Sequence, residues 1–231
     1  MGGRSTRGGW ARGDRPLVSQ DSLVGVLALQ GAFSEHLQAL EAIGVTGREV
    51  RVPRELEGLD GLIIPGGEST AMGRLMVAYG LVDALRDFCR RKPVLGTCAG
   101  MVMLSKATAG CSQTLLGVID ATVHRNAFGR QVNSFEADIE IDFSLVGMGD
   151  RETMRGVFIR APWVEDLGKD VKVLSRLGGK AIAVQQGDLV AVAFHPELTG
   201  DRKVHRYFLE VVSRAKRTRE GAGVVRDKQE V

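Results

Sequence analysis

The residues best suited to chemistry lie in Gly96-Thr97-Cys98-Ala99-Gly100, where a short apolar run meets a helical pattern. A cysteine between small residues at a strand-to-helix junction is the thiol version of the nucleophile elbow. The glycines permit a sharp turn, and the N-terminus of the helix favours the thiolate over the thiol. A buried structural cysteine is the alternative. The glycine spacing favours a nucleophile at Cys98, whereas Cys89 and Cys111 have no such setting.

A thiolate nucleophile needs a proton carrier, and Ala193-Phe194-His195-Pro196-Glu197 supplies a candidate at the end of an apolar strand. In extended geometry residues i and i+2 point to the same side, so His195 and Glu197 can share a face. Glu197 could then orient the imidazole and stabilise its cation. A surface histidine beside a solvated glutamate is the alternative for this motif alone. Together with Cys98, it predicts a Cys–His–Glu triad.

A third polar segment, Gly66-Gly67-Glu68-Ser69-Thr70, also follows a strand pattern and precedes a helix pattern. Two glycines let the backbone turn its amides outward, where they can hold an oxyanion. Capping of the helix by Ser69 or Thr70 is an alternative that is compatible with this role. A phosphate-binding loop is the rival function, but neither G-x-x-x-x-G-K-[ST] nor G-x-G-x-x-G is present.

The remaining histidines are interpreted as ordinary residues. We expect His36 and His205 on helix surfaces and His124 on a strand. The cysteines and histidines lack metal-ligand spacing, so no metal site is predicted.

The elements that must position these residues follow from hydrophobic patterning. Leu23–Leu29, Gly61–Pro65 and Pro93–Thr97 are apolar runs that suit strands buried on both faces, and helical patterns follow them. This order predicts a single-domain α/β fold with an open, mostly parallel twisted sheet flanked by helices. Alternation in Phe135–Ile141 adds a few antiparallel strands, and a last helix ends near Val212.

Composition limits the function class. The chain has 231 residues, 44% of them hydrophobic and 26% charged, which fits one globular domain. Its apolar runs are too short to span a bilayer, so no membrane association is predicted. We expect residues 23–212 to form the domain, with disordered segments at 1–22 and 213–231. These tails hold the excess basic charge, so nucleic-acid binding is not predicted. Three cysteines indicate reduced cytosol, hence a cytoplasmic location.

These motifs together resemble the triad (class I) glutamine amidotransferase family. Within it, the resemblance is to the glutaminase subunits of pyridoxal 5′-phosphate synthase, and it covers about Val24 to Val212. It rests on five separated stretches in the expected order: Leu27-Ala28-Leu29-Gln30-Gly31, Pro65-Gly66-Gly67-Glu68-Ser69-Thr70, Arg125-Asn126-Ala127-Phe128-Gly129, Ser134-Phe135-Glu136-Ala137-Asp138 and Phe158-Ile159-Arg160-Ala161-Pro162.

The resemblance implies hydrolysis of L-glutamine to glutamate and ammonia, with no cofactor. The ammonia passes to a separate barrel-shaped synthase subunit that makes pyridoxal 5′-phosphate. Activity would be coupled to docking of that subunit near Gln30. The residues that match family positions are the nucleophile Cys98, the acid/base His195, its orienter Glu197, the oxyanion donors Gly67 and Ala99, and the glutamine-binding positions Gly67, Glu68, Ser69, Arg125, Ile159 and Arg160.

Three alternatives stay open at this point. The chain could be a glutaminase subunit for another acceptor, such as an imidazole-ring synthase. It could be a non-catalytic regulatory subunit of the same fold, against which the intact Cys98, His195 and Glu197 set argues. A free-standing cysteine peptidase is the weakest, since no extended peptide cleft can be inferred. Arg125 alone could equally be a solvent-facing strand residue.

Overall fold

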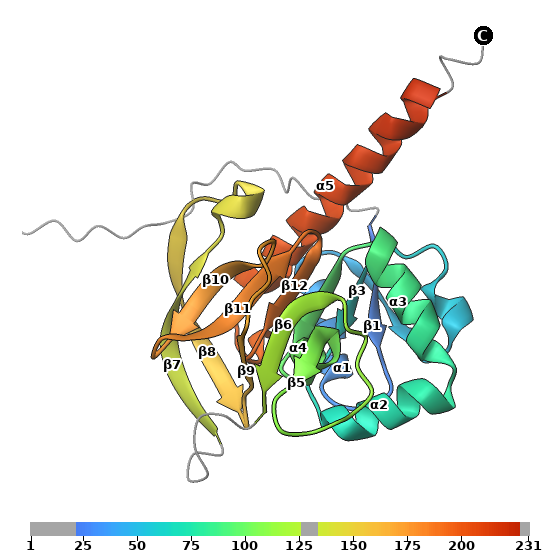
Figure 1. Ribbon diagram of the computed structural model, residues 1–231. Helices are drawn as coiled ribbons and strands as arrows, with labels where there is room; N and C mark the ends of the chain where they lie inside the picture. Colours follow the sequence, from blue (N-terminus) through green and yellow to red (C-terminus); the bar gives the residue numbers. More distant parts are fainter. Residues whose placement is uncertain (1–21, 126–133, 227–231) are drawn as a thin grey trace, which may run out of the picture.

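A ten-stranded mixed sheet forms the centre of the molecule (Figure 1). The structure is a computed structural model that describes residues 22–125 and 134–226. In sheet order the strands are β2 (Thr46–Val50), β1 (Leu23–Leu27), β3 (Gly61–Ile64), β4 (Val94–Thr97), β12 (Leu189–Val192), β11 (Lys180–Gln186), β9 (Trp163–Glu165), β6 (Ile119–His124) and β5 (Ser105–Thr108), with β10 (Lys172–Leu177) paired to β11.

The sheet has a parallel part and a mixed part. All pairings from β2 through β1, β3 and β4 to β12 are parallel. Beyond β12 the pairings are antiparallel, except that β5 and β6 run parallel. Every residue of β3 and β4 is buried, as their continuous apolar runs predicted. The predicted α/β class with a few antiparallel strands is therefore confirmed.

The alternating segment near residue 135 forms a separate antiparallel pair of strands, β7 (Ser134–Asp142) and β8 (Arg151–Ile159). Ile139 and Ile141 are buried, while the alternate acidic residues are not. On the outer face, Arg155 of β8 pairs with Glu136 and Asp138 of β7. The end of β8 contacts the segment that holds His195, because the Val157 carbonyl accepts a hydrogen bond from the His195 backbone N–H at 2.8 Å.

Helices cover both faces of the parallel part (Figure 1). Along β4, Gly96 faces α4 whereas the Thr97 side chain contacts His36 of α1, so these two helices lie on opposite faces. α5 lies on the α1 face, and α2 packs against both α3 and α4. The helices are α1 (Phe33–Glu41), α2 (Ser69–Ala78), α3 (Leu81–Arg91), α4 (Ala99–Leu104) and α5 (Lys203–Arg226), with 3-10 turns η1 (Pro53–Leu56), η2 (Ser144–Val146) and η3 (Pro196–Leu198).

This topology gathers the candidate residues at one edge of the sheet. Gln30 follows β1, Gly67 follows β3, Cys98 follows β4 and His195 follows β12. The four strands are parallel neighbours, so their carboxyl ends meet on the same side, where open α/β sheets hold their ligands.

The C-terminal helix is longer than the sequence analysis predicted. α5 continues through Arg226, so the predicted disorder of residues 213–231 is wrong for residues 213–226. Ala215 is buried and extends the apolar stripe formed by Phe208 and Val212. Of the other predicted disordered segment, Ser22 is buried, while residues 1–21 lie outside the described residues.

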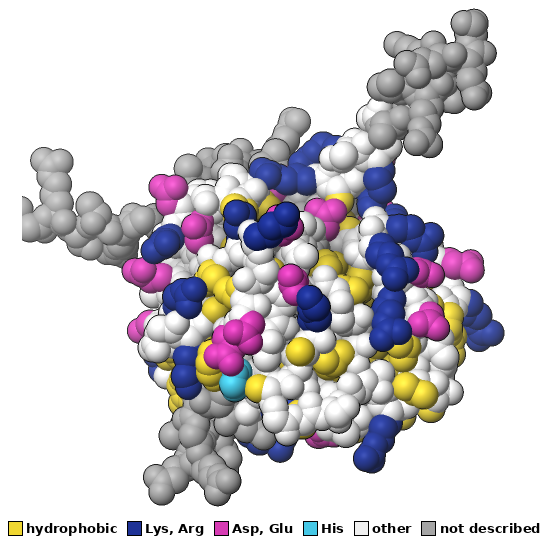
Figure 2. Space-filling view, in the orientation of Figure 1, with side chains coloured by type: hydrophobic (Ala, Val, Ile, Leu, Met, Phe, Trp, Pro, Cys, Tyr) yellow, Lys and Arg dark blue, Asp and Glu magenta, His cyan; other side chains and the backbone are white. Residues whose placement is uncertain are grey.

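Ion pairs explain why the charged end of α5 stays helical. The carboxylate of Glu210, which is itself buried, pairs with Arg214 at 3.5 Å and Arg217 at 3.1 Å. Lys216 reaches Asp60 at 3.4 Å, and Arg219 donates to the Arg91 carbonyl of α3 at 2.9 Å. Figure 2 shows Lys and Arg side chains gathered over this part of the surface, with Asp and Glu between them. No helix among the described residues is long and apolar enough to cross a membrane.

Truncation tests the packing of α5. We expect a chain that ends at residue 213 to melt at a lower temperature than one that ends at residue 221, because only the former loses both partners of Glu210. An unpaired buried polar group costs about 1–3 kcal/mol, and each kcal/mol lowers the Tm of a chain this size by roughly 2–4 °C. Calorimetry of the two chains measures the difference, and equal Tm values would contradict this role.

Candidate active site

A pocket of about 170 Å³ opens at the carboxyl edge of the parallel strands. It contains nine of the eleven residues predicted from the sequence. The two others lie beside it: Glu197 behind His195, and Gln30 against the backbone of Glu68. Its lining is Gly67, Glu68, Ser69, Cys98, Ala99, Val102, Arg125, Ile159, Arg160, Pro162 and His195.

Cys98 occupies the predicted sharp turn between β4 and α4. Its φ of 48° and ψ of −100° form a strained conformation that is characteristic of functional sites. A Cβ on Gly96 would lie 2.6 Å from the Gly100 backbone, and one on Gly100 would lie 2.1 Å from the Ile64 carbonyl oxygen. Only glycine fits either place. The turn presents Cys98 Sγ to the pocket, 3.7 Å from the Ile159 carbonyl oxygen.

His195 and Glu197 form the predicted pair on the other side of the pocket. Nδ1 of His195 lies 2.7 Å from Oε1 of Glu197, which belongs to η3. His195 is only 6% exposed and Glu197 5%, so the solvated surface pair considered for this motif is excluded. Because Nδ1 is bound to Glu197, Nε2 is the ring nitrogen that remains for the interaction of His195 with Cys98.

Opposing effects set the pKa of His195. Burial lowers it, but the hydrogen bond with Cys98, that with Glu197 and the charges of both groups together raise the pKa to about 10. The imidazole is therefore a cation at neutral pH, placed between a sulfur and a carboxylate. A cation in this position stabilises a thiolate and can donate a proton to a leaving group.

The loop after β3 is held by two contacts from the loop after β1. The Ala32 N–H donates to the Gly66 carbonyl at 3.1 Å. The amide of Gln30 bonds the backbone of Glu68 twice, accepting from its N–H at 3.2 Å and donating to its carbonyl at 3.1 Å. A Cβ on Gly67 would lie 2.4 Å from Gln30 Nε2, so a larger residue there would displace the Gln30 amide. The peptide that carries the predicted oxyanion donor Gly67 is thus fixed from outside the pocket.

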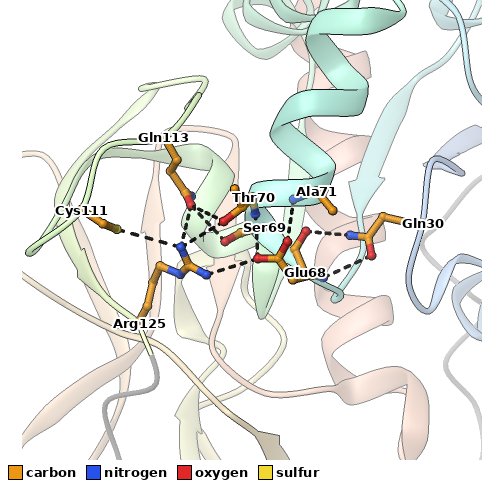
Figure 3. A network of polar contacts seen from close by, with 8 residues as sticks. All are labelled: Gln30, Glu68, Ser69, Thr70, Ala71, Cys111, Gln113 and Arg125. Carbon is orange, nitrogen blue, oxygen red and sulfur yellow. Dashed lines mark hydrogen bonds and ion pairs between the residues drawn. The ribbon is translucent and has the colours of Figure 1, made fainter.

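Figure 3 shows how Glu68 organises the polar wall of the pocket. Its carboxylate caps α2 by accepting from the N–H groups of Thr70 at 3.0 Å and Ala71 at 2.6 Å. The cap is therefore Glu68 and not Ser69 or Thr70. Burial raises the pKa of Glu68. These hydrogen bonds and the charge of Arg125 outweigh burial and lower the pKa below its ordinary value. An ionised Glu68 lies 3.3 Å from Arg125.

Arg125 follows β6 and faces this wall rather than solvent alone. Its guanidinium donates to Gln113 Oε1 at 2.9 Å and to Thr70 Oγ1 at 3.3 Å. Sequence reasoning missed Gln113, because it lies in a segment with no motif. The other residues of the Arg125-Asn126-Ala127-Phe128-Gly129 stretch lie outside the described residues.

The far wall comes from the end of β8. Ile159 contributes its carbonyl beside Cys98 Sγ, and Arg160 follows with a φ of 45°, a second strained residue at the pocket. Val102 and Pro162, which the sequence analysis did not select, complete the lining. Among the described residues no group of three or more His, Cys, Asp or Glu could hold a metal ion.

Two histidines differ from the sequence interpretation. His36 and His205 were expected on helix surfaces, yet both are fully buried. His36 Nδ1 lies 3.0 Å from His205 Nε2, and His36 Nε2 lies 3.1 Å from Thr97 Oγ1 and 3.3 Å from Glu197 Oε2. The available signal was position: His36 falls between Phe33 and Leu40 on the apolar stripe of α1. His124 lies on β6, as expected.

Comparison with known proteins agrees with this geometry. A family model described as the SNO glutamine amidotransferase family matches residues 26–214. The chain belongs to this glutamine amidotransferase family. It is 51% identical to a protein of Moorella thermoacetica over 82% of this chain and 98% of the relative, and 54% identical to one of Desulforudis audaxviator over the same shares. Both relatives are named pyridoxal 5′-phosphate synthase subunit PdxT.

Solved structures agree on the amidotransferase fold. A crystal structure of a glutamine amidotransferase matches with a TM-score of 0.75 and 50% identity, covering 82% of this chain and 98% of that one. The family model ends at residue 214, before the end of α5 at Arg226.

Titration of His195 tests the electrostatics of this amidotransferase site. We expect NMR to give a His195 pKa well above the ordinary value of about 6.5 in the wild type, and a lower pKa in Cys98→Ser, which removes the contribution of Cys98 to this pKa. The raised pKa also stabilises the fold below about pH 6.5, and that contribution is lost as pH rises toward the folded-state pKa of about 10. An unchanged His195 pKa in Cys98→Ser would contradict the coupling.

Proposed function

We propose that this chain is the glutaminase subunit of a pyridoxal 5′-phosphate synthase. It hydrolyses L-glutamine to L-glutamate and passes the ammonia to a barrel-shaped synthase subunit. The observation that carries the proposal is the buried His195–Glu197 pair, 2.7 Å apart, across one pocket from a strained cysteine. The relatives, which are about half identical over nearly their whole length, are named as subunits of pyridoxal 5′-phosphate synthase, and these names support that synthase as the acceptor of the ammonia.

The reaction begins with attack of the Cys98 thiolate on the side-chain amide carbon of glutamine. The backbone N–H groups of Gly67 and Ala99 hold the negative charge that develops on the amide oxygen. His195 gives its proton to the leaving nitrogen, so ammonia departs and a glutamyl thioester remains. Neutral His195 then takes a proton from water, which attacks the thioester and releases glutamate and the Cys98 thiolate. Throughout, Glu197 stabilises the cationic form of His195.

The polar wall suits the amino-acid end of glutamine. The Arg125 guanidinium, oriented by Gln113 and Thr70, can bind the α-carboxylate in bidentate fashion. Glu68 and Ser69 lie beside it, and Ile159 and Arg160 close the opposite side. The α-carboxylate of glutamine can thus face Arg125, and its α-ammonium group can face Glu68. The predicted cytoplasmic location stays a prediction.

Two alternative functions, a non-catalytic regulatory subunit and a glutaminase for another acceptor, have less support. A non-catalytic regulatory subunit has no use for a strained cysteine held against a buried His–Glu pair, because strain and buried charge both cost stability. A glutaminase for a different acceptor would have the same site, so the geometry does not argue against it. The names of the relatives do.

Replacement of the nucleophile tests the proposed reaction. We expect Cys98→Ser to abolish ammonia release from glutamine in the presence of the synthase subunit, while the Tm changes little. Cys111→Ser and Cys89→Ala serve as controls and should keep most of the activity. Cys111 is exposed, and burial raises the pKa of Cys89 to about 12, which makes that thiol inert. A near-normal rate in Cys98→Ser would contradict the assignment.

Coupling to the partner is tested at Gln30. We expect the isolated chain to be a poor glutaminase and saturating synthase to raise its rate by roughly a hundredfold. This needs about 3 kcal/mol of differential affinity of the synthase for a conformation of the loop after β3 in which the Gly67 N–H points into the pocket. Gln30→Ala removes both bonds to Glu68 and should diminish this activation. Gln38→Ala, an exposed residue on α1, is the matched control. Equal rates with and without synthase would exclude the coupling.

A further inference from the structure

A buried polar row continues inward from the triad, and the reaction steps above do not use it. Oε2 of Glu197, the oxygen that faces away from His195, lies 3.3 Å from Nε2 of His36. The contact is not itself a hydrogen bond in the structure, so that oxygen is buried without a hydrogen-bond partner among the described residues. Both side chains are completely inaccessible to solvent. A buried carboxylate oxygen without a donor is costly, so the state of His36 matters.

The carboxylate determines which nitrogen of His36 carries the proton. A lone pair on Nε2 would face the negative oxygen and repel it, whereas an Nε2–H donates to it. With the proton on Nε2, Nδ1 is an acceptor and receives the hydrogen of His205 Nε2 at 3.0 Å. Nδ1 of His205, which has no partner in the described part of the chain, is then a bare acceptor rather than a stranded N–H. This arrangement gives Oε2 of Glu197 a donor and leaves neither imidazole with a buried N–H that lacks an acceptor.

We propose that His36 is a positioning residue for the catalytic glutamate: its neutral imidazole donates Nε2–H to Oε2 of Glu197 and so holds Oε1 against Nδ1 of His195. This inference rests on the proposed glutaminase function, and it adds to the triad a residue that positions Glu197. His36 touches neither substrate nor sulfur, and it acts through Glu197 alone. Thr97 Oγ1 lies 3.1 Å from the same nitrogen, which therefore stands between the hydroxyl and the carboxylate.

Neutrality is part of this role. A cationic His36 would compete with His195 for the charge of Glu197. Burial lowers the pKa of His36 well below its ordinary value, and the charges of His205, His195 and Arg202 lower it further. Burial likewise lowers the pKa of His205 to about 4. Glu197 is the one anion in contact with His36 in the described structure, and His195 retains its charge.

Two amide variants separate positioning from mere packing. A glutamine at position 36 places its amide nitrogen near the place of Nε2 and can still donate to Glu197. An asparagine reaches only the place of Nδ1, so it keeps the contact with His205 and loses Glu197. We expect kcat of glutamine hydrolysis, measured with saturating synthase, to be about tenfold to a hundredfold lower in His36→Asn than in His36→Gln. KM should differ little, because His36 does not line the pocket.

Equal kcat values in the two variants, or a lower kcat in His36→Gln, would overturn the proposal. His205→Leu is the matched control: it removes the other imidazole of the pair without touching Glu197. The proposal expects it to lower the Tm while its kcat stays above that of His36→Asn. A kcat in His205→Leu as low as in His36→Asn would also overturn it, since packing would then explain both.

The wild-type protein provides a test that needs no folded variant. Nitrogen-15 NMR of imidazole-labelled protein distinguishes the tautomers of His36 directly. The proposal requires the Nε2–H tautomer at neutral pH, and an Nδ1–H tautomer or a cation would overturn it. This readout does not depend on turnover. A wild type with this tautomer and no glutaminase activity would refute the proposed function instead, so the two failures are distinguishable.

Discussion

A carboxylate that is completely removed from water is the constraint on which the rest of the site depends. The side chain of Glu197 is inaccessible to solvent, and a buried charge is tolerated only when it is paired. One oxygen bonds His195, and the other faces His36. The pairing raises the pKa of His195 against the effect of burial, so a cation is available beside Cys98 at neutral pH. The chemistry of the pocket follows from this charge.

The fold delivers the partners of that carboxylate from distant parts of the chain. Cys98 and His195 follow β4 and β12, which are parallel neighbours, so their side chains meet at one edge of the sheet. His36 comes from α1 on one face, and the backbone of α4 covers the other. Two of the three non-glycine residues with a positive φ in the described structure, Cys98 and Arg160, line the pocket, where the surrounding sheet can hold the strain; the third, Asp166, lies outside it.

Much of this could be predicted from sequence because the signals are local. The apolar runs gave the buried strands, and Gly96 and Gly100 marked the elbow around Cys98. The role of His36 could not be predicted in this way, since its partners Thr97 and His205 lie 61 and 169 residues away. Gln113 belongs to no motif, and its place in the site is evident only from its hydrogen bond with Arg125. The end of α5 was missed because its stabilising pairs with Glu210 are spread around a charged helix.

The central claim is that Cys98 is the nucleophile of a glutaminase, and covalent trapping tests it most directly. A glutamine analogue with a chloroketone in place of the side-chain amide would react with a thiolate held in the pocket. Incubation with the synthase subunit, followed by peptide mass spectrometry, should find one label per chain on Cys98, and excess glutamine should prevent it. Labelling of the exposed Cys111 instead, or labelling that glutamine does not prevent, would contradict the account.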